Sequence, residues 1–427
     1  MVSSPGKSLI AGGYLVLDPH YSGLAVGLSA RIYCRCQTVD KCEKSPSSGK
    51  ITVISPQFKS ASWEYNLLQD GRLTQTNKQG RNGNAYIENV LIAVFKYLDI
   101  KSLTKSLSIT VYADKEYYSQ SGATKSHPTN KFVYFDTTLE DTAKTGLGSS
   151  AALITSVTAA VLLCLENSGI LDDINNAYTR NIIHNLAQYA HCTAQGKVGS
   201  GFDVAAAVYG GIRYRRFPAT LLEQWSHNDD SNEQFKIFID SKWDMEIIPN
   251  AFPPCLHVIM GDVSRGSATP GMVRKVLSWR TNGEEEAEEH WKTLGEANTK
   301  LADKLESLGN KTGGGAIEAK DETVVASLFA HTRRLLREMG EKSGTEIEPV
   351  EQTRVLDATL KVSGVVAAGV PGAGGYDAVF CIISAIEKDR VREAVAQVWS
   401  MYNVRELDVE EDTQGMREEQ SSIMEAK

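Results

Sequence analysis

The stretch KTGLGSSAA occupies residues 144–152 and runs directly into an apolar segment that ends near residue 166. Gly146 and Gly148 allow the backbone to approach a ligand closely and to adopt positive φ angles. The apolar segment predicts a buried helix over 151–166, and the start of a helix exposes unpaired N–H groups and a partial positive charge. Ser149 and Ser150 add hydroxyl groups that can bond a phosphate or a magnesium ion. These features predict a phosphate-binding loop, while a glycine turn with a serine N-cap would explain the same residues without a ligand.

Three further glycine-rich segments lie far from this loop in the sequence. The first, PGKS at residues 5–8, lacks the glycine five positions before Gly6 that a P-loop requires, so Lys7 is either a single cation in a site or a solvated lysine. The second, KVGSGFD, ends at Asp203, whose small and apolar neighbours predict a half-buried carboxylate that pairs with a cation or caps a helix. The third, VPGAGGYD at residues 370–377, is by itself equally typical of a connecting loop.

Arginines and histidines provide weaker signals. In the strand predicted over Ile212–Phe217, Arg213 and Arg215 point to one face and Arg216 to the other. Two arginines on one face can clamp a phosphate or a carboxylate, and a solvated edge strand is the alternative. On the helix predicted over 175–195, His184 and His191 share a face, but a metal site there lacks a clear third ligand.

The remaining segments mix strands and helices without regular alternation. Apolar patterning predicts strands at 51–54, 107–112, 235–239, 256–261 and 378–383, and helices at 84–97, 271–279, 285–308, 322–339 and 389–402. This order predicts an α+β protein rather than a doubly wound sheet. The polar stretch 224–234 is the best candidate for a boundary, and it divides the chain into domains of residues 1–225 and 235–427.

The composition limits the kinds of partner. The 427 residues carry 45 Lys and Arg against 53 Asp and Glu, a net charge of −8. An acidic chain is a poor ligand for nucleic acid or anionic lipid, but a few local cations can still hold a small anion. Seven cysteines spread over a long chain predict reduced thiols. No stretch resembles a cleavable signal peptide or reaches the roughly 20 apolar residues that span a bilayer, so we expect a soluble, cytoplasmic protein.

The four glycine-rich segments, taken in order, resemble those of the GHMP small-molecule kinases. The matching strings are Pro5-Gly6-Lys7 with Gly12-Gly13-Tyr14, Gly146 to Ala152, Gly199 to Asp203, and Pro371 to Asp377. The resemblance implies a two-domain α+β kinase fold, with an N-terminal half like ribosomal protein S5 domain 2, a ferredoxin-like C-terminal half, and the active site between them. One departure is Ala143, where the family usually has a proline two residues before Thr145.

The resemblance also implies roles for individual residues. ATP and Mg²⁺ would be the cofactors, with Ser149 or Ser150 near the metal. Asp203 matches the catalytic aspartate and Lys7 its neighbouring lysine. The ATP phosphates would contact Lys144, Thr145, Gly146, Leu147, Gly148, Ser149, Ser150 and Ala151. The substrate-side positions are Tyr14, Ser200, Gly201, Gly374 and Tyr376, to which we add Lys197 and Arg213 as candidate contacts of the acceptor's phosphate.

Within the family, the strings most resemble those of members whose acceptor is (R)-5-phosphomevalonate. A phosphate monoester is mostly dianionic at pH 7, so it needs little deprotonation, and repulsion from the ATP γ-phosphate is the larger obstacle. We therefore expect Asp203 to act mostly through orientation and electrostatics, organising Lys7. The alternatives are a relative with a different acceptor, such as mevalonate kinase, and a non-catalytic sensor on the same fold. The expected partners are small molecules, with neither nucleic acid nor a membrane among them.

Overall fold

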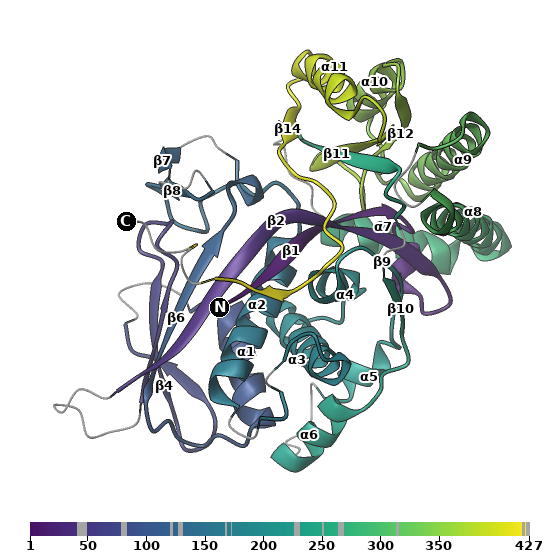
Figure 1. Cartoon of the computed structure of the whole chain (residues 1–427). Coiled ribbons are helices and arrows are strands. Elements are labelled where there is room, and N and C mark those ends of the chain that lie inside the picture. The colour runs from purple at the N-terminus through teal and green to yellow at the C-terminus, as the bar shows by residue number, and fades with distance from the viewer. Residues whose placement is uncertain are drawn as a thin grey trace.

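The computed structural model describes residues 1–427 except 41–48, 78–82, 120–122, 127–130, 167–168, 172, 226–230, 250–251, 264–268, 313–315, 421–422 and 424–427. Two larger sheets with their helices form two lobes (Figure 1), and Ala123–Ser126 and Val133–Phe135 form a third sheet of two strands. The elements of the first lobe are β1 (Val2–Ala11), η1 (Leu15–Leu17), β2 (Ser22–Val39), β3 (Lys50–Ile54), β4 (Ser62–Leu67), β5 (Leu73–Gln75), α1 (Ala85–Tyr97), β6 (Ser106–Ala113), η2 (Lys115–Tyr117), β7 (Ala123–Ser126), β8 (Val133–Phe135), α2 (Ser149–Leu165), α3 (Ala177–Gln195), α4 (Phe202–Tyr209), β9 (Ile212–Arg215), α5 (Thr220–Glu223), α6 (Asn232–Asp240) and β10 (Glu246–Pro249).

The elements that follow form the second lobe and the C-terminal end of the chain. They are β11 (Leu256–Asp262), α7 (Thr269–Asn282), α8 (Glu284–Thr312), α9 (Ala319–Ser343), α10 (Val350–Thr359), β12 (Val365–Gly369), β13 (Ala378–Ser384), α11 (Lys388–Ser400), β14 (Arg405–Leu407) and β15 (Arg417–Glu418). The mixture of helices and largely antiparallel sheets confirms the predicted α+β class.

The first lobe is built on one large, strongly curved sheet. Its strand order is β10-β9-β2-β6-β3-β4-β5, and β1 pairs with β2 on one side and with β15 on the other. Helix α2 packs against β1 and β2, with α1, α3 and α4 around it. Because neighbours surround α2, its residues from Ala151 to Leu162 are buried almost without interruption, which explains why the sequence showed no polar face.

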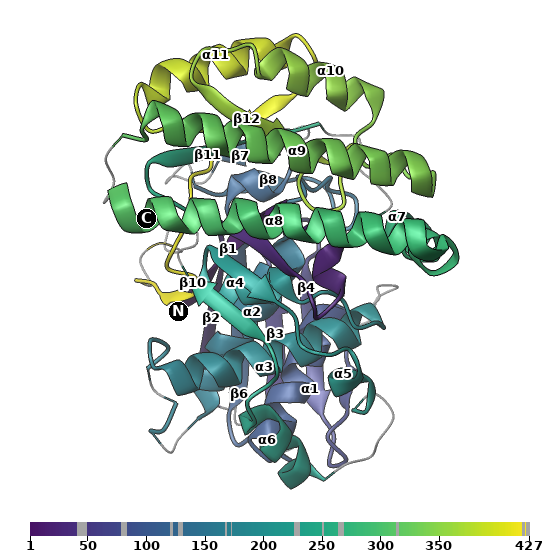
Figure 2. The ribbon, with the colours of Figure 1, turned by 90° about the vertical axis from the view of Figure 1, so that its right-hand side faces the viewer.

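The second lobe is an antiparallel sheet in the order β12-β13-β11-β14. The long helices α8 and α9 lie side by side along it (Figure 2), and α10 and α11 pack together against the same sheet. Helix α8 also contacts β2 of the first lobe, so it bridges the two lobes. In the described part of the chain, no helix combines the length and the apolar character that crossing a membrane requires.

The strand predicted at Phe235–Ile239 is wrong, because these residues belong to helix α6. Phe235, Ile237 and Ile239 alternate as in a strand, but Ile237 is 64% exposed, while Phe235, Phe238 and Ile239 are buried at helical spacing. Ser231 starts the helix: its hydroxyl accepts from the Gln234 N–H, and the Gln234 side chain accepts from the Ser231 N–H. This capping box sat in the polar stretch that the sequence analysis assigned to a boundary.

The position of the domain boundary stays a prediction, and residues 226–230 of the stretch 224–234 lie outside the described residues. Two observations favour a later division, between β10 and β11. Helix α6 packs on α1 and α3, and β10 pairs with β9, so both extend the first lobe.

The C-terminal strap, residues 409–419, returns from the second lobe to the first strand of the chain (Figure 1). Arg31, which is 1% exposed, forms an ion pair with Asp412, donates to the Gly415 carbonyl, and bonds the hydroxyl and carbonyl oxygens of Ser3 at 2.7 and 3.1 Å. The Asp412 N–H donates to the Gly27 carbonyl at 2.7 Å. The strap is therefore held by a buried charge pair as well as by backbone pairing.

We expect Asp412→Asn to destabilise the protein by up to about 3–5 kcal/mol, because the buried Arg31 guanidinium loses its nearest counter-charge and keeps the more distant Glu419, at 3.8 Å. The control is Asp408→Asn, since Asp408 is 72% exposed and pairs with Arg392 at 3.3 Å in solvent. That change should cost less than about 1 kcal/mol. Urea unfolding of both variants measures the difference, and equal losses would contradict a stabilising role for the buried pair.

Candidate active site

The loop 144–152 has the backbone geometry that its sequence predicts for a phosphate-binding loop. Helix α2 begins at Ser149, and its N-cap is Gly148 in the left-handed conformation with φ 80°. Gly146 is also left-handed, with φ 76°. No side chain caps this helix start, so the alternative of a serine N-cap is wrong. The helix therefore presents free N–H groups and two hydroxyls next to a flexible glycine turn.

Lys7 lies directly against this loop. Its N–H donates to the Leu147 carbonyl at 2.9 Å, and its side chain passes so close to Gly148 that a Cβ there would lie 2.6 Å from Lys7 Cε. The Lys7 ammonium group sits over the Phe202 ring, 5.3 Å from its centre. Burial lowers the pKa of Lys7, while the carboxylates of Asp203 and Asp377 oppose that shift. The lysine is thus a cation of the site and not a solvated surface residue.

Asp203 is the second residue of helix α4, which starts after the left-handed Gly201. One of its carboxylate oxygens accepts from the Val204 N–H at 3.0 Å, and the other lies 3.8 Å from Nε2 of His191. The same His191 nitrogen is 3.2 Å from the Ser150 hydroxyl. His191 therefore connects the phosphate-binding loop with Asp203, a role that sequence reasoning missed because it considered His191 only as a metal ligand.

His184 does not join His191 in a metal site. It is fully buried, contacts Tyr209 and Trp243, and bonds the Asn185 side chain at 3.0 Å, so burial lowers its pKa to about 4. In the described ranges, no group of three or more His, Cys, Asp or Glu side chains could hold a metal ion. The described cysteines are free thiols, as the sequence predicts.

Three cavities meet around these residues, and we name each by its contents. The Lys7 cavity, about 210 Å³, is lined among others by Lys7, Tyr14, Gly146, Ser200, Gly374 and Asp377. The Asp203 cavity, about 350 Å³, includes Lys197, Ser200, Gly201, Asp203, Arg216 and Arg280. The aromatic cavity includes Trp63, Tyr86, Lys144, Ser149, Ser150 and Leu153. Ser200 lines both of the first two cavities, so these are neighbours.

The third glycine segment reaches the site from the second lobe. The Gly372 N–H donates to the Leu9 carbonyl at 2.8 Å, and the Tyr14 hydroxyl donates to the Ala373 carbonyl at 2.7 Å. Burial raises the pKa of Tyr14, so its hydroxyl keeps its proton. Asp377 follows this segment, and its Cβ would lie 3.7 Å from a Cβ placed on Gly146. The sequence analysis quoted Asp377 as part of a loop but did not assign it to the site.

Two predicted substrate contacts, Arg213 and Tyr376, do not line these cavities. Arg213 faces helix α8, where it bonds Asp303 at 2.6 Å and lies 3.6 Å from Glu306. The Tyr376 hydroxyl lies 3.4 Å from the Glu351 carboxylate at the surface. The geometry therefore does not support either residue as a substrate contact. Thr145, Leu147 and Ala151 lie in the loop, but their side chains are buried in the protein, so only their backbones can face a ligand.

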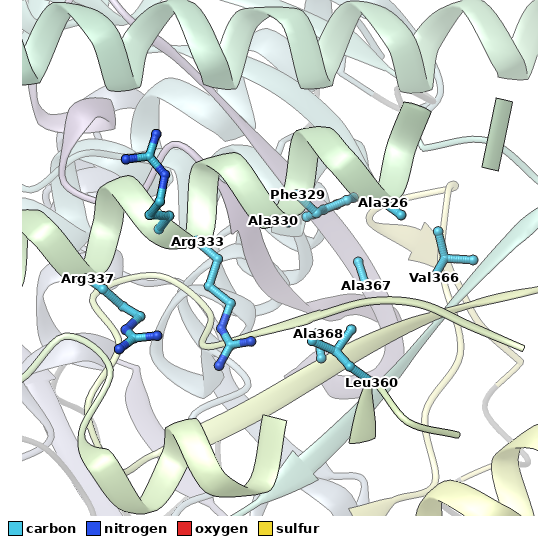
Figure 3. Close-up of a pocket in the computed structure, with 10 residues that line it drawn as sticks. Ala326, Phe329, Ala330, Arg333, Arg337, Leu360, Val366, Ala367 and Ala368 are labelled. Carbon is cyan, nitrogen blue, oxygen red and sulfur yellow. The ribbon is translucent and has the colours of Figure 1, made fainter. Parts of the chain in front are cut away.

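Arginines also gather at a cavity of about 130 Å³ between α9 and β12, outside the site (Figure 3). Arg333 and Arg337 extend from α9 toward the same side. Carboxylates already surround Arg333, with Glu348 at 2.6 Å and Asp357 at 2.9 Å, and Glu338 lies 2.5 Å from Arg334. Arg333 and Arg334 therefore already have carboxylate partners within the protein.

Two models of known protein families match the chain. The model of the GHMP kinases N-terminal domain matches residues 116–211, and that of the GHMP kinases C-terminal domain matches residues 325–400. The chain belongs to the GHMP kinase family, a class of small-molecule kinases.

Its relatives include several phosphomevalonate kinases. The protein of that name from Gibberella zeae is 37% identical, over 99% of this chain and 97% of its own length. The one from Candida albicans is 33% identical, over 98% and 97%. A relative from Arabidopsis thaliana, named as peroxisomal, is 32% identical over 97% and 95%. The Streptococcus pneumoniae phosphomevalonate kinase in complex with phosphomevalonate and AMPPNP shares the fold, with a TM-score of 0.66 and 15% identity over 96% of this chain and 100% of that chain.

We expect Gly148→Ala to lower kcat/KM for ATP by at least about 100-fold, because the added methyl group displaces the Lys7 side chain from the loop. Gly196→Ala is a matched control, since Gly196 is also left-handed, with φ 65°, but has open space around its Cβ position. Both changes carry a similar backbone strain of about 1–2 kcal/mol. Steady-state kinetics separates the two effects, and an equal loss in both variants would show that strain alone matters.

Proposed function

We propose that this protein is a phosphomevalonate kinase, which transfers the γ-phosphoryl group of ATP to (R)-5-phosphomevalonate and gives 5-diphosphomevalonate and ADP. The observation that carries this proposal is the near full-length identity of 32–37% to kinases of that name. The arrangement of the cavities supports it, because cations and helix N-termini face a space large enough for two phosphorylated ligands.

We place the ATP phosphates on the loop 144–151, where backbone N–H groups and the start of α2 favour negative charge. The aromatic cavity is continuous with this loop through Lys144, Ser149 and Ser150. Its apolar and aromatic walls, which include Trp63 and Tyr86, suit a flat heteroaromatic base. We therefore assign the adenine part of ATP to this cavity, which the sequence left unassigned.

The residues at the start of α2 fit a magnesium ion. Ser149 and Ser150 offer hard oxygen ligands, and Mg²⁺ typically takes few protein ligands and completes its shell with phosphate oxygens and water. Bound there, the ion would neutralise charge on the ATP phosphates. The Ser150 hydroxyl is held 3.2 Å from Nε2 of His191, so the protein fixes its position before a ligand arrives.

We assign the acceptor to the Lys7 and Asp203 cavities, with contacts from Tyr14, Lys197, Ser200, Gly201 and Gly374. Lys7 is placed to offset the repulsion between the two phosphates, and Asp203 to keep Lys7 charged and oriented. Because the acceptor is already a dianion at neutral pH, the site needs no strong base. Action in the cytoplasm stays a prediction, since a plant relative is named as peroxisomal.

A panel of acceptors tests the assignment directly. We expect ADP release, measured by a coupled assay, to require ATP and to be highest with 5-phosphomevalonate. Higher kcat/KM with mevalonate would make the protein a hydroxyl kinase of the same family. ATP binding by calorimetry without turnover of any acceptor would instead identify a sensor.

The pH dependence of Asp203→Asn tests the role of the carboxylate. We expect kcat near pH 7 to fall by less than about 100-fold, where loss of an essential general base can cost up to about 10⁴-fold. We also expect the alkaline limb of the pH profile to move to lower pH, because the Asp203 charge raises the pKa of Lys7 and its removal lowers that pKa. Complete inactivity at every pH between 6 and 9 would contradict this weak-base role.

A further inference from the structure

Arg216 is a buried arginine that forms no ion pair with a carboxylate among the described residues. It follows strand β9, is only 4% exposed, and points to the opposite side from Arg213. Its Nε donates to the Phe217 carbonyl at 3.1 Å and its Nη1 to the Leu17 carbonyl at 2.7 Å. Its Nη2 has no hydrogen-bond partner among the described residues.

Two other arginines show how this protein treats a buried guanidinium that has a structural role. Arg31 is paired with Asp412 and hydrogen-bonded at its remaining nitrogens. Arg280 lines the same cavity as Arg216, but it bonds Asp18 at 2.7 Å and Glu288 at 3.0 Å and stacks on Trp291. Arg216 bonds only neutral carbonyl oxygens, and burial lowers its pKa although nearby acidic groups such as Glu223 and Asp18 oppose the shift. A buried guanidinium without a paired carboxylate lowers the stability of the fold unless an anionic group of a bound ligand pairs with it.

The position of Arg216 indicates which anion this is. Arg216 lines the Asp203 cavity together with Lys197, Ser200 and Asp203, but it does not line the neighbouring Lys7 cavity. The phosphate that receives the γ-phosphoryl group must lie near Lys7 and the loop 144–151, where the donor ends. Arg216 therefore lines a part of the acceptor site that Lys7 does not line.

We propose that Arg216 binds the carboxylate of the acceptor and selects for substrates that carry an anion at both ends. This inference rests on the proposed function, since phosphomevalonate has a phosphate at one end and a carboxylate at the other. A guanidinium forms strong, directional hydrogen bonds to a carboxylate. A site that leaves a buried charge unpaired rejects an analogue that lacks the matching group, so the unpaired Nη2 provides specificity as well as affinity.

The test compares Arg216→Met with the control Arg213→Met, since Arg213 lies three residues earlier, in β9, and lines neither of the two cavities. We expect Arg216→Met to raise KM for phosphomevalonate by about 10- to 100-fold and to leave KM for ATP within about threefold. The competitive Ki of 3-methylbutyl phosphate, which lacks the carboxylate, should stay within about threefold of the wild-type value. Arg213→Met should change none of these constants. The unfolding midpoint of Arg216→Met should be unchanged or higher, because a buried charge without an ion-pair partner is removed.

Three results would overturn the proposal. The first is an unchanged KM for phosphomevalonate. The second is an equal loss of affinity for 3-methylbutyl phosphate, which would assign Arg216 to the phosphate. The third is a lower unfolding midpoint together with loss of both substrates, which would make Arg216 structural. If Arg216→Met does not fold, Arg216→Lys decides, because a lysine keeps the charge but not the planar fork and should still raise KM for phosphomevalonate at least about fivefold. A wild-type protein that is inactive on phosphomevalonate would instead refute the proposed function.

Discussion

The contact between the first strand and the phosphate-binding loop is the constraint on which the site depends. The hydrogen bond from the Lys7 N–H to the Leu147 carbonyl fixes β1 beside the start of α2, and the missing side chain at Gly148 makes room for the lysine stem. One consequence is that the cation and the helix N-terminus face the same small volume. Another is that Asp203, at the start of α4, can act on Lys7 without touching the loop itself. His191 completes the arrangement by linking Ser150 with Asp203.

The second lobe contributes by closing this volume, and it does so mainly through backbone. Gly372 and Ala373 bond to Leu9 and to the Tyr14 hydroxyl, so the closing loop is tied to residues that flank Lys7. Asp377 then brings a second carboxylate near the lysine, where its charge opposes the lowering of the Lys7 pKa by burial. The net charge of −8 on the whole chain has little influence on ligand binding around Lys7, because a few cations in a desolvated cavity determine which ligands bind there.

Patterns that are local in the sequence predicted the backbone geometry of the loop and of the helix starts, and contacts between distant segments were beyond them. The glycines of 144–152 and the small residues before Asp203 set backbone geometry within a few positions, so the loop and the helix starts could be inferred. The alternation of side chains along a strand correctly placed Arg213 and Arg216 on opposite faces. It could not show which face packs against α8 and which faces the Asp203 cavity. The aromatic cavity joins Trp63 of β4 to Tyr86 of α1, a pairing with no signature in either segment. In α6, the apolar residues of Phe235–Ile239 fit both the alternation of a strand and the spacing of a helix. The capping box at Ser231 was the sequence signal that favoured the helix.

The C-terminal strap has a consequence for how the protein is made. Arg31 belongs to the second strand of the chain, yet its counter-charge and one of its carbonyl partners come from residues 412 and 415. During synthesis, this arginine lacks these partners until residues 412–415 have left the ribosome. Folding of the first lobe is thereby tied to synthesis of the strap, and a chain that stops short of residue 412 leaves Arg31 in its first sheet without Asp412 and Glu419.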